Sequence, residues 1–145
     1  VLELVHRSST KDDAETTGVT LAIVEFSGGR PRLSALTEPS LFAATADWSP
    51  DGAWIVYSAL PEAKAKAPDL FLIRPDGSDR RRLTRLAGEG ISATEPAFDT
   101  DSTSVVFVTD SPPALRRVDL SRGTIEAAFA NDVQGNHPRA RPGAR

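Results

Sequence analysis

The sequence predicts an all-β protein built from repeated four-stranded antiparallel sheets, and three observations lead to this expectation. Short apolar stretches alternate with turns that contain Gly or Pro along most of the chain. One pattern of turn and apolar residues returns after about 50 residues. No segment has the 3.6-residue periodicity of an amphipathic helix longer than a turn or two.

The pattern is clearest at residues 46–59. Ser49-Pro50-Asp51-Gly52 has the composition of a hairpin turn, because Pro fixes φ, Asp can bond back to the backbone, and Gly accepts a positive φ. The residues that follow, Trp54 to Tyr57, are apolar in succession rather than in alternation. A continuous apolar run of this length is typical of a strand covered on both faces. We therefore expect this strand to lie between two other layers.

The repeat indicates the architecture. A period near 50 residues with four short strands per unit is typical of the blades of a β-propeller. We expect a partial propeller of about two and a half to three blades, with units at about 1–40, 41–90 and 91–130, and with no innermost strand in the first unit. Three aligned pairs lie 50 residues apart: Trp48 and Phe98, Asp51 and Asp101, and Tyr57 and Phe107. Two further pairs lie 49 residues apart: Leu21 and Leu70, and Gly28 and Gly77.

Apolar stretches and turn residues together predict the individual elements. A hairpin turn is expected at 27–29, a polar loop at 8–18, and a disordered tail at 131–145, where apolar residues are almost absent. Strands are expected near 1–5, 21–26, 33–37, 53–59, 69–74, 80–86, 104–109, 115–120 and 124–129.

Composition excludes several classes of protein. The 17 basic and 20 acidic side chains give a formal net charge of −3, which disfavours a nucleic-acid or membrane-surface partner. The chain has no Cys, so it has no disulfide, thiolate metal site or Cys nucleophile. No apolar run approaches the roughly 20 residues of a membrane span. The chain opens at Val1 directly on an apolar stretch, as expected of a fragment or a processed product.

No catalytic, metal or cofactor site is predicted. The two histidines, His6 and His137, are far apart in the sequence, and no Gly-x-Ser-x-Gly elbow is present. Asp51, Asp76 and Asp101 could present oxygen ligands to calcium, but the same turn in each unit favours carboxylates that cap their own turns.

Two further groups of side chains have a structural and a functional interpretation. A set of arginines could form a basic patch, but the solvated face of outer strands has the same composition, and we favour that interpretation. Five aromatic residues at repeat-equivalent or strand positions are expected in the core between blades. The arginines are Arg80, Arg81, Arg82, Arg85, Arg116 and Arg117, and the aromatic residues are Trp48, Trp54, Tyr57, Phe98 and Phe107.

Residues 46–84 resemble a known repeat. The turn Ala46-Asp-Trp-Ser-Pro-Asp-Gly52, the stretch Asp69-Leu-Phe-Leu-Ile-Arg-Pro-Asp-Gly77 and Arg82-Leu-Thr84 are similar to the TolB-like, WD40-like (PD40) propeller repeat. Residues 95–129 resemble a degenerate copy, with Asp99-Thr-Asp-Ser102 as its turn. The resemblance implies the last part of a propeller that closes into six blades, from a bacterial protein of the periplasm or the cell exterior.

Two functions follow from this resemblance. The first is a non-catalytic module, not an enzyme, whose loops and channel rim bind a protein or peptide partner and which needs no cofactor. The second is a propeller that gates or positions substrate for a prolyl-oligopeptidase-like hydrolase encoded elsewhere in a longer chain. A purely structural fragment is a third possibility. In each case we expect remaining blades, or a second copy of the chain, to cover the open flanks of the partial propeller.

Overall fold

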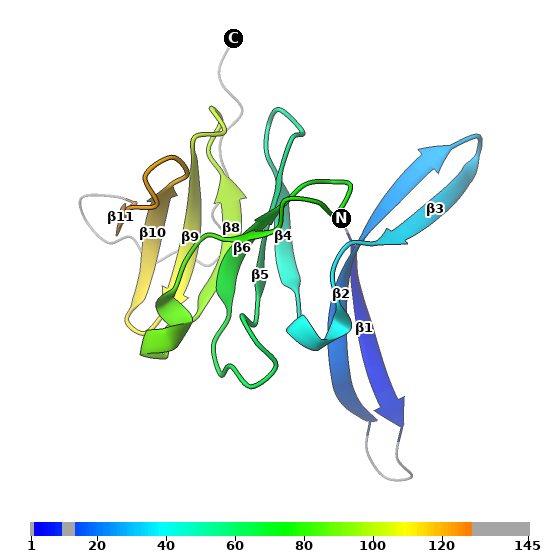
Figure 1. Cartoon of the computed structure of the whole chain (residues 1–145), viewed down its shortest axis with the longest axis horizontal. Helices are drawn as coiled ribbons and strands as arrows, with labels where there is room; N and C mark the ends of the chain where they lie inside the picture. The colour runs from blue at the N-terminus through cyan, green and yellow to red at the C-terminus, as the bar shows by residue number, and fades with distance from the viewer. Residues whose placement is uncertain (1, 10–13, 129–145) are drawn as a thin grey trace.

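The computed structural model describes residues 2–9 and 14–128 and confirms the all-β prediction (Figure 1). The strands form three antiparallel sheets that stand side by side. In these residues the helical segments are two short 3-10 turns, η1 (Pro39–Leu41) and η2 (Leu86–Glu89).

Each sheet is made of consecutive strands. We call the sheets the first, second and third blade, in chain order. The first contains three strands in the order β1-β2-β3, and the other two contain four each, in the orders β4-β5-β6-β7 and β8-β9-β10-β11. The strands are β1 (Leu2–Ser9), β2 (Ala14–Ser27), β3 (Arg30–Ala35), β4 (Ala44–Trp48), β5 (Ile55–Ala59), β6 (Asp69–Ile73), β7 (Arg81–Arg82), β8 (Ala93–Phe98), β9 (Ser104–Asp110), β10 (Pro113–Asp119) and β11 (Ile125–Ala127).

Strand β5 lies between two apolar layers, as its continuous apolar sequence predicts. Its five residues are all buried. Ile55, Tyr57 and Ala59 belong to the core cluster shared with Leu21 of the first blade. Val56 points to the opposite face, in the cluster that contains Phe107 of the third blade. Successive side chains of one strand therefore supply the cores on both sides of the second blade.

The pairing registers show which residues of the second and third blades are equivalent. Trp48 lies opposite Ile55 and Phe98 opposite Val105, so Trp48 and Phe98 occupy the same place on the innermost strands. Phe98 is only 2% exposed, but Trp48 is 37% exposed, and the expectation that both are buried is wrong for Trp48.

The difference between Trp48 and Phe98 has a structural cause. Phe98 faces the second blade, in which β4, β5 and β6 contact β8. Trp48 faces the first blade, in which the described strand equivalent to β5 is the edge strand β1, with no inner neighbour. The absence of an innermost strand from the described part of the first blade therefore leaves Trp48 uncovered.

Several predicted boundaries need correction. The polar composition of 8–18 predicts a loop, but Ser8 and Ser9 lie in β1 and residues 14–18 lie in β2. Polar residues can pair in a ladder when their backbone groups find partners, which a composition-based prediction does not detect. The strand expected at 80–86 shrinks to Arg81–Arg82, because Leu86 starts η2. The tail expected at 131–145 lies outside the described residues, and the limits of the three units stay predictions.

The first hairpin turns of the second and third blades have the same backbone geometry. Gly52 adopts a φ of 71°, and its N–H donates to the carbonyl of Ser49 at 2.8 Å. In the third blade Ser102 takes the place of Gly52 with a φ of 59°, and donates to the carbonyl of Asp99 at 3.0 Å. The degenerate turn therefore keeps the geometry of the Ser-Pro-Asp-Gly turn, although a side chain is disfavoured at positive φ.

The repeated aspartates cap their own turns, as predicted. Hydrogen bonds from the Ser49 hydroxyl and then from the Ala53 N–H hold the pKa of Asp51 below its usual value. Ser78 lowers the pKa of Asp76, and Thr103 lowers that of Asp101, each through its hydroxyl and then its N–H. These bonds favour the ionised carboxylate in the folded state.

We expect the capped turns to make stability depend on pH. The folded-state pKa values lie below the unfolded value of about 3.9, so the folded chain binds fewer protons near that pH. The free energy of unfolding should be retained above about pH 5 and fall as pH is lowered through about 4. Urea midpoints measured across this range test the expectation. The triple variant Asp51→Asn, Asp76→Asn and Asp101→Asn should show a weaker dependence of the urea midpoint on pH. A dependence as steep as that of the parent chain would contradict the expectation.

Candidate functional site

The innermost strands of the second and third blades, β4 and β8, form the candidate site. Each is an edge strand of its sheet, with a hydrogen-bonded neighbour on one side. They contact one another across the interface between the two blades (Figure 1). In a propeller the innermost strands line the central channel, so we call these two strands the axial rim.

Both strands of the axial rim are interrupted by a bulge at the same place. The register with β5 shifts between Ala44 and Ala46, where Thr45 has a φ of 41°. The register with β9 shifts between Thr94 and Ala97, where Glu95 has a φ of 50°. A positive φ is rare for residues other than Gly, and rarest for a β-branched one such as Thr. Bulges redirect side chains and are common next to functional sites.

Local contacts hold the bulge of β4. The hydroxyls of Thr45 and Ser58 are 2.7 Å apart, and the Ser58 hydroxyl also donates to the carbonyl of Ala44 at 3.0 Å. In β8 the residue after Glu95 is Pro96, which has no N–H to donate and is tolerated on an edge strand. Thr45 and Glu95 are both half-buried. The two bulges therefore place Thr45 and Glu95 at equivalent positions of neighbouring blades.

A hydrogen bond fixes the two rim strands to one another. The Asp47 carboxylate of β4 accepts from the N–H of Phe98 on β8 at 2.9 Å. This bond joins residues of different blades, and Phe98 packs in the core between them. The spacing of Thr45 and Glu95 along the rim is therefore set by both a polar and an apolar contact.

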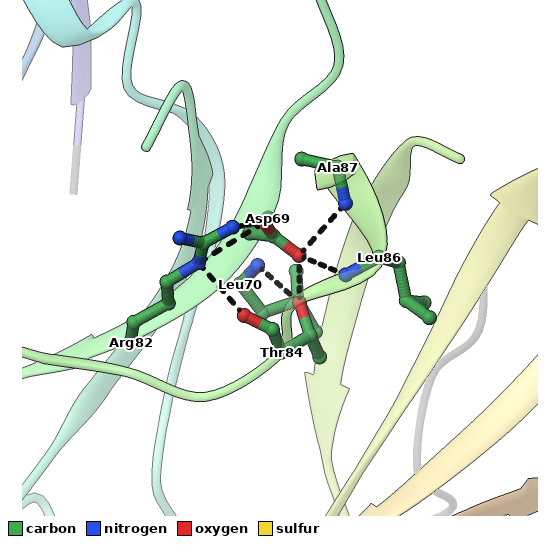
Figure 2. A network of polar contacts seen from close by, with 6 residues as sticks. All are labelled: Asp69, Leu70, Arg82, Thr84, Leu86 and Ala87. Carbon is green, nitrogen blue, oxygen red and sulfur yellow. Dashed lines mark hydrogen bonds and ion pairs between the residues drawn. The ribbon is translucent and has the colours of Figure 1, made fainter. Parts of the chain in front are cut away.

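A buried polar network on the outer side of the second blade has a structural role (Figure 2). The Asp69 side chain is fully buried and accepts from the guanidinium of Arg82, with its Nε at 3.1 Å. It also accepts from the Thr84 hydroxyl at 2.6 Å and from the Leu86 N–H at 2.8 Å, while Thr84 accepts from the Leu70 N–H. The network ties β6 to β7 and to η2, and both carboxylate oxygens of Asp69 are used within it.

Most arginines of the expected basic patch contact neighbouring side chains. Arg80 donates to the Tyr57 hydroxyl at 2.9 Å and stacks on Phe71, and Arg81 stacks on Trp54. Arg82 pairs with Asp69, and Arg117 pairs with Asp99 and donates to the Ser104 hydroxyl, so four of the six arginines have such contacts. These contacts support the interpretation as outer-strand surface rather than as an anion-binding patch.

The two histidines contribute no described side chain to the axial rim. The side chain of His6 and all of His137 lie outside the described residues. Among the residues that the structure describes, no three His, Asp or Glu side chains gather as metal ligands would. Sequence reasoning does not single out Thr45 and Glu95, although their spacing of 50 residues equals that of Trp48 and Phe98. That shared spacing is the signal that could have identified them.

Comparisons with known proteins agree with the fold. No family model matches the sequence, and no curated protein matches it. The structure is similar to TolB from Acinetobacter baumannii, with 21% identity and a TM-score of 0.65 over 86% of this chain and 30% of that one. It is also similar to a protein assigned as TolB from Agrobacterium tumefaciens, with 19% identity, a TM-score of 0.64, and coverage of 95% and 49%.

An enzyme is among the similar structures. A puromycin-hydrolysing peptidase of Mycobacterium tuberculosis matches with 19% identity and a TM-score of 0.56, over 89% of this chain and 21% of the peptidase. The chain thus spans half or less of the length of each of these proteins. In the described part of the chain, no helix is long and apolar enough to cross a bilayer. The sheets, their order and these similarities show that the chain has the fold of part of a TolB-like β-propeller.

Proposed function

We propose that the chain is a non-catalytic propeller module that binds a protein or peptide partner at the axial rim, in the periplasm or outside the cell. The observation that carries the proposal is the pair of equivalent bulges at Thr45 and Glu95. A bulge at positive φ costs about 1–3 kcal/mol, and its repetition in two blades favours a role at the channel. An edge strand also offers backbone groups to an extended peptide.

Peptide selection tests the proposal. A random peptide library would be selected on the full chain, and the dissociation constants of the selected peptides would be measured by fluorescence anisotropy. We expect Glu95→Lys to weaken binding by about tenfold or more, which corresponds to about 1.4 kcal/mol, because it reverses the charge of the side chain at the bulge of β8.

Glu126→Lys is the matched control. Glu126 lies on β11, the outermost strand of the same blade, and is exposed. This variant has the same change of charge and should leave the dissociation constants within about twofold, or about 0.4 kcal/mol. Equal effects of the two variants, or the absence of any selected peptide, would contradict binding at the rim.

The second candidate function is a propeller that gates substrate for a hydrolase. The similarity to the peptidase structure favours it, although that similarity covers only 21% of the peptidase. The parent reading frame separates the two functions. A Gly-x-Ser-x-Gly segment with Asp and His downstream would support the gate, and a stop codon after Arg145 would support the binding module.

A further inference from the structure

A cleft lies between the third blade and η2, the short turn that leads into it from the second blade. Its volume is about 300 Å³, at the lower end of the range of about 300–1,000 Å³ that small-molecule sites occupy. One wall is η2, and the others are the turn between β9 and β10 and the outer strands β10 and β11 (Figure 1). The cleft is therefore separate from the axial rim. Its lining includes Leu86, Glu89, Ile91, Thr109, Arg116 and Ile125.

The neighbouring interface between blades has a buried aromatic ring at the equivalent place. Phe71 lies opposite Tyr57, and Arg116 lies opposite Phe107, which stands 50 residues after Tyr57. Arg116 therefore takes the place of Phe71. The Phe71 side chain is 5% exposed and stacks on Tyr57 with ring centroids 5.7 Å apart. The guanidinium of Arg80 covers the same ring at 4.6 Å.

The covering residue on the outermost strand is exchanged as well. Arg81 lies opposite Leu72, and Arg80 is the next residue toward the turn. On the third blade Glu126 takes the place of Arg81, and Ile125 takes that of Arg80. The second blade thus has a ring covered by a cation, whereas the third has a cation beside an aliphatic side chain. This double exchange leaves the cleft open.

The charge of Arg116 has no partner in the cleft. Arg116 faces the second blade, because Val118, two residues further along β10, packs in the core shared with that blade. Arg116 is half-buried, and among the described residues its guanidinium has no hydrogen bond, ion pair or ring contact. Glu89 lines the same cleft, but it is exposed and does not pair with Arg116. Partial burial of an unpaired charge is unfavourable, and a bound anion would offset this cost.

We infer that the cleft binds a small carboxylate that carries an apolar group. The planar guanidinium of Arg116 can donate two parallel hydrogen bonds to the carboxylate. Leu86, Ile91 and Ile125 provide apolar surface for the rest of the ligand, which occupies the space that Phe71 fills in the other interface. This site is independent of peptide binding at the axial rim.

Saturation-transfer NMR with 3-phenylpropionate tests the inference on the full chain. The method observes the ligand, so a low protein concentration is sufficient. We expect saturable binding to the parent chain. Arg116→Gln should raise the dissociation constant by about tenfold or more, because it removes the charge-assisted hydrogen bonds to the carboxylate. Absence of saturable binding to the parent chain, or equal dissociation constants of the two proteins, would overturn the inference.

Two controls separate recognition at the cleft from attraction by the general charge. Arg85→Gln removes the same charge from an exposed arginine that does not line the cleft, and should leave the dissociation constant within about twofold. The uncharged analogue 3-phenylpropionamide should bind the parent chain more weakly than the carboxylate, and Arg116→Gln should not weaken it further. Equal losses of carboxylate binding in Arg85→Gln and Arg116→Gln would overturn the inference.

Filling the cleft provides a second arm. Arg116→Phe places an aromatic ring where the other interface has Phe71, so both compounds should lose their binding and the thermal midpoint should exceed that of Arg116→Gln. Should Arg116→Phe prevent folding, Ile125→Trp should block the cleft from the outermost strand, where Ile125 is 37% exposed. Carboxylate binding that persists at the parent level in a folded chain with either substitution would overturn the inference.

Discussion

Replacing Asp69 by Ala should destabilise the chain by about 3–5 kcal/mol, because it breaks a buried ion pair and leaves its partners unpaired. The carboxylate is fully buried and accepts from Arg82, Thr84 and the N–H groups at the start of η2 (Figure 2). Its removal leaves the Arg82 guanidinium and the Leu86 N–H without their acceptor. Urea unfolding monitored by circular dichroism at low protein concentration gives the free energy of unfolding.

Asp79→Ala is the control for this prediction. Asp79 pairs with Arg74 at 2.9 Å, but the two side chains are 62% and 42% exposed. Exposed pairs contribute about 0–1 kcal/mol, and Ala at the positive φ of Asp79 (54°) adds a backbone cost of about 1 kcal/mol. This variant should therefore lose clearly less stability than Asp69→Ala. Asp69→Asn retains an acceptor without the charge and should fall between the two. A loss at Asp69→Ala no larger than that at Asp79→Ala would show that the network does not stabilise the fold.

Phe98→Ala should cost about 3–5 kcal/mol, the usual range for removing a buried aromatic side chain. Phe98 is 2% exposed and packs in the core between the second and third blades. Its loss opens a cavity in that interface, where Val105 and Phe107 are the neighbouring buried residues. The substitution should therefore weaken the contact between blades as well as the third blade itself.

Trp48→Ala is the matched variant on the second blade. Trp48 has the equivalent register but is 37% exposed, so its removal should cost less than half as much as that of Phe98. The comparison tests whether an innermost strand covers this position in the first blade. Equal losses of stability in the two variants would mean that Trp48 is covered, and that the first blade is more complete than its described strands show.

The second and third blades could be predicted because their sequences are locally consistent. The Pro-Asp-Gly turns and the continuous apolar runs of β5 and β6 each favour the same structure. The exposure of the Trp48 side chain could not be predicted, because its burial depends on a strand in another blade. The extent of β1 and β2 could not be predicted either, since polar residues at 8–18 pair through backbone groups that the sequence does not display.

The axial rim is less accessible to sequence reasoning than the core. The capping role of Asp51 follows from its own turn, so a local argument is sufficient. The bulges at Thr45 and Glu95 are recognised only from the shift of register and the positive φ, which are properties of the paired strands. The contact of Asp47 with Phe98 spans two blades and likewise requires the arrangement of the sheets.

Sedimentation of the full chain, combined with its thermal melt, tests most directly the claim that the chain is an open part of a propeller. The free face of the first blade exposes Phe26 and Leu33, so we expect the chain to associate or aggregate at micromolar concentrations. Substitution of both residues by Ser should reduce this association. A chain that is strictly monomeric and melts cooperatively would contradict the account, because nothing would then cover the exposed flank.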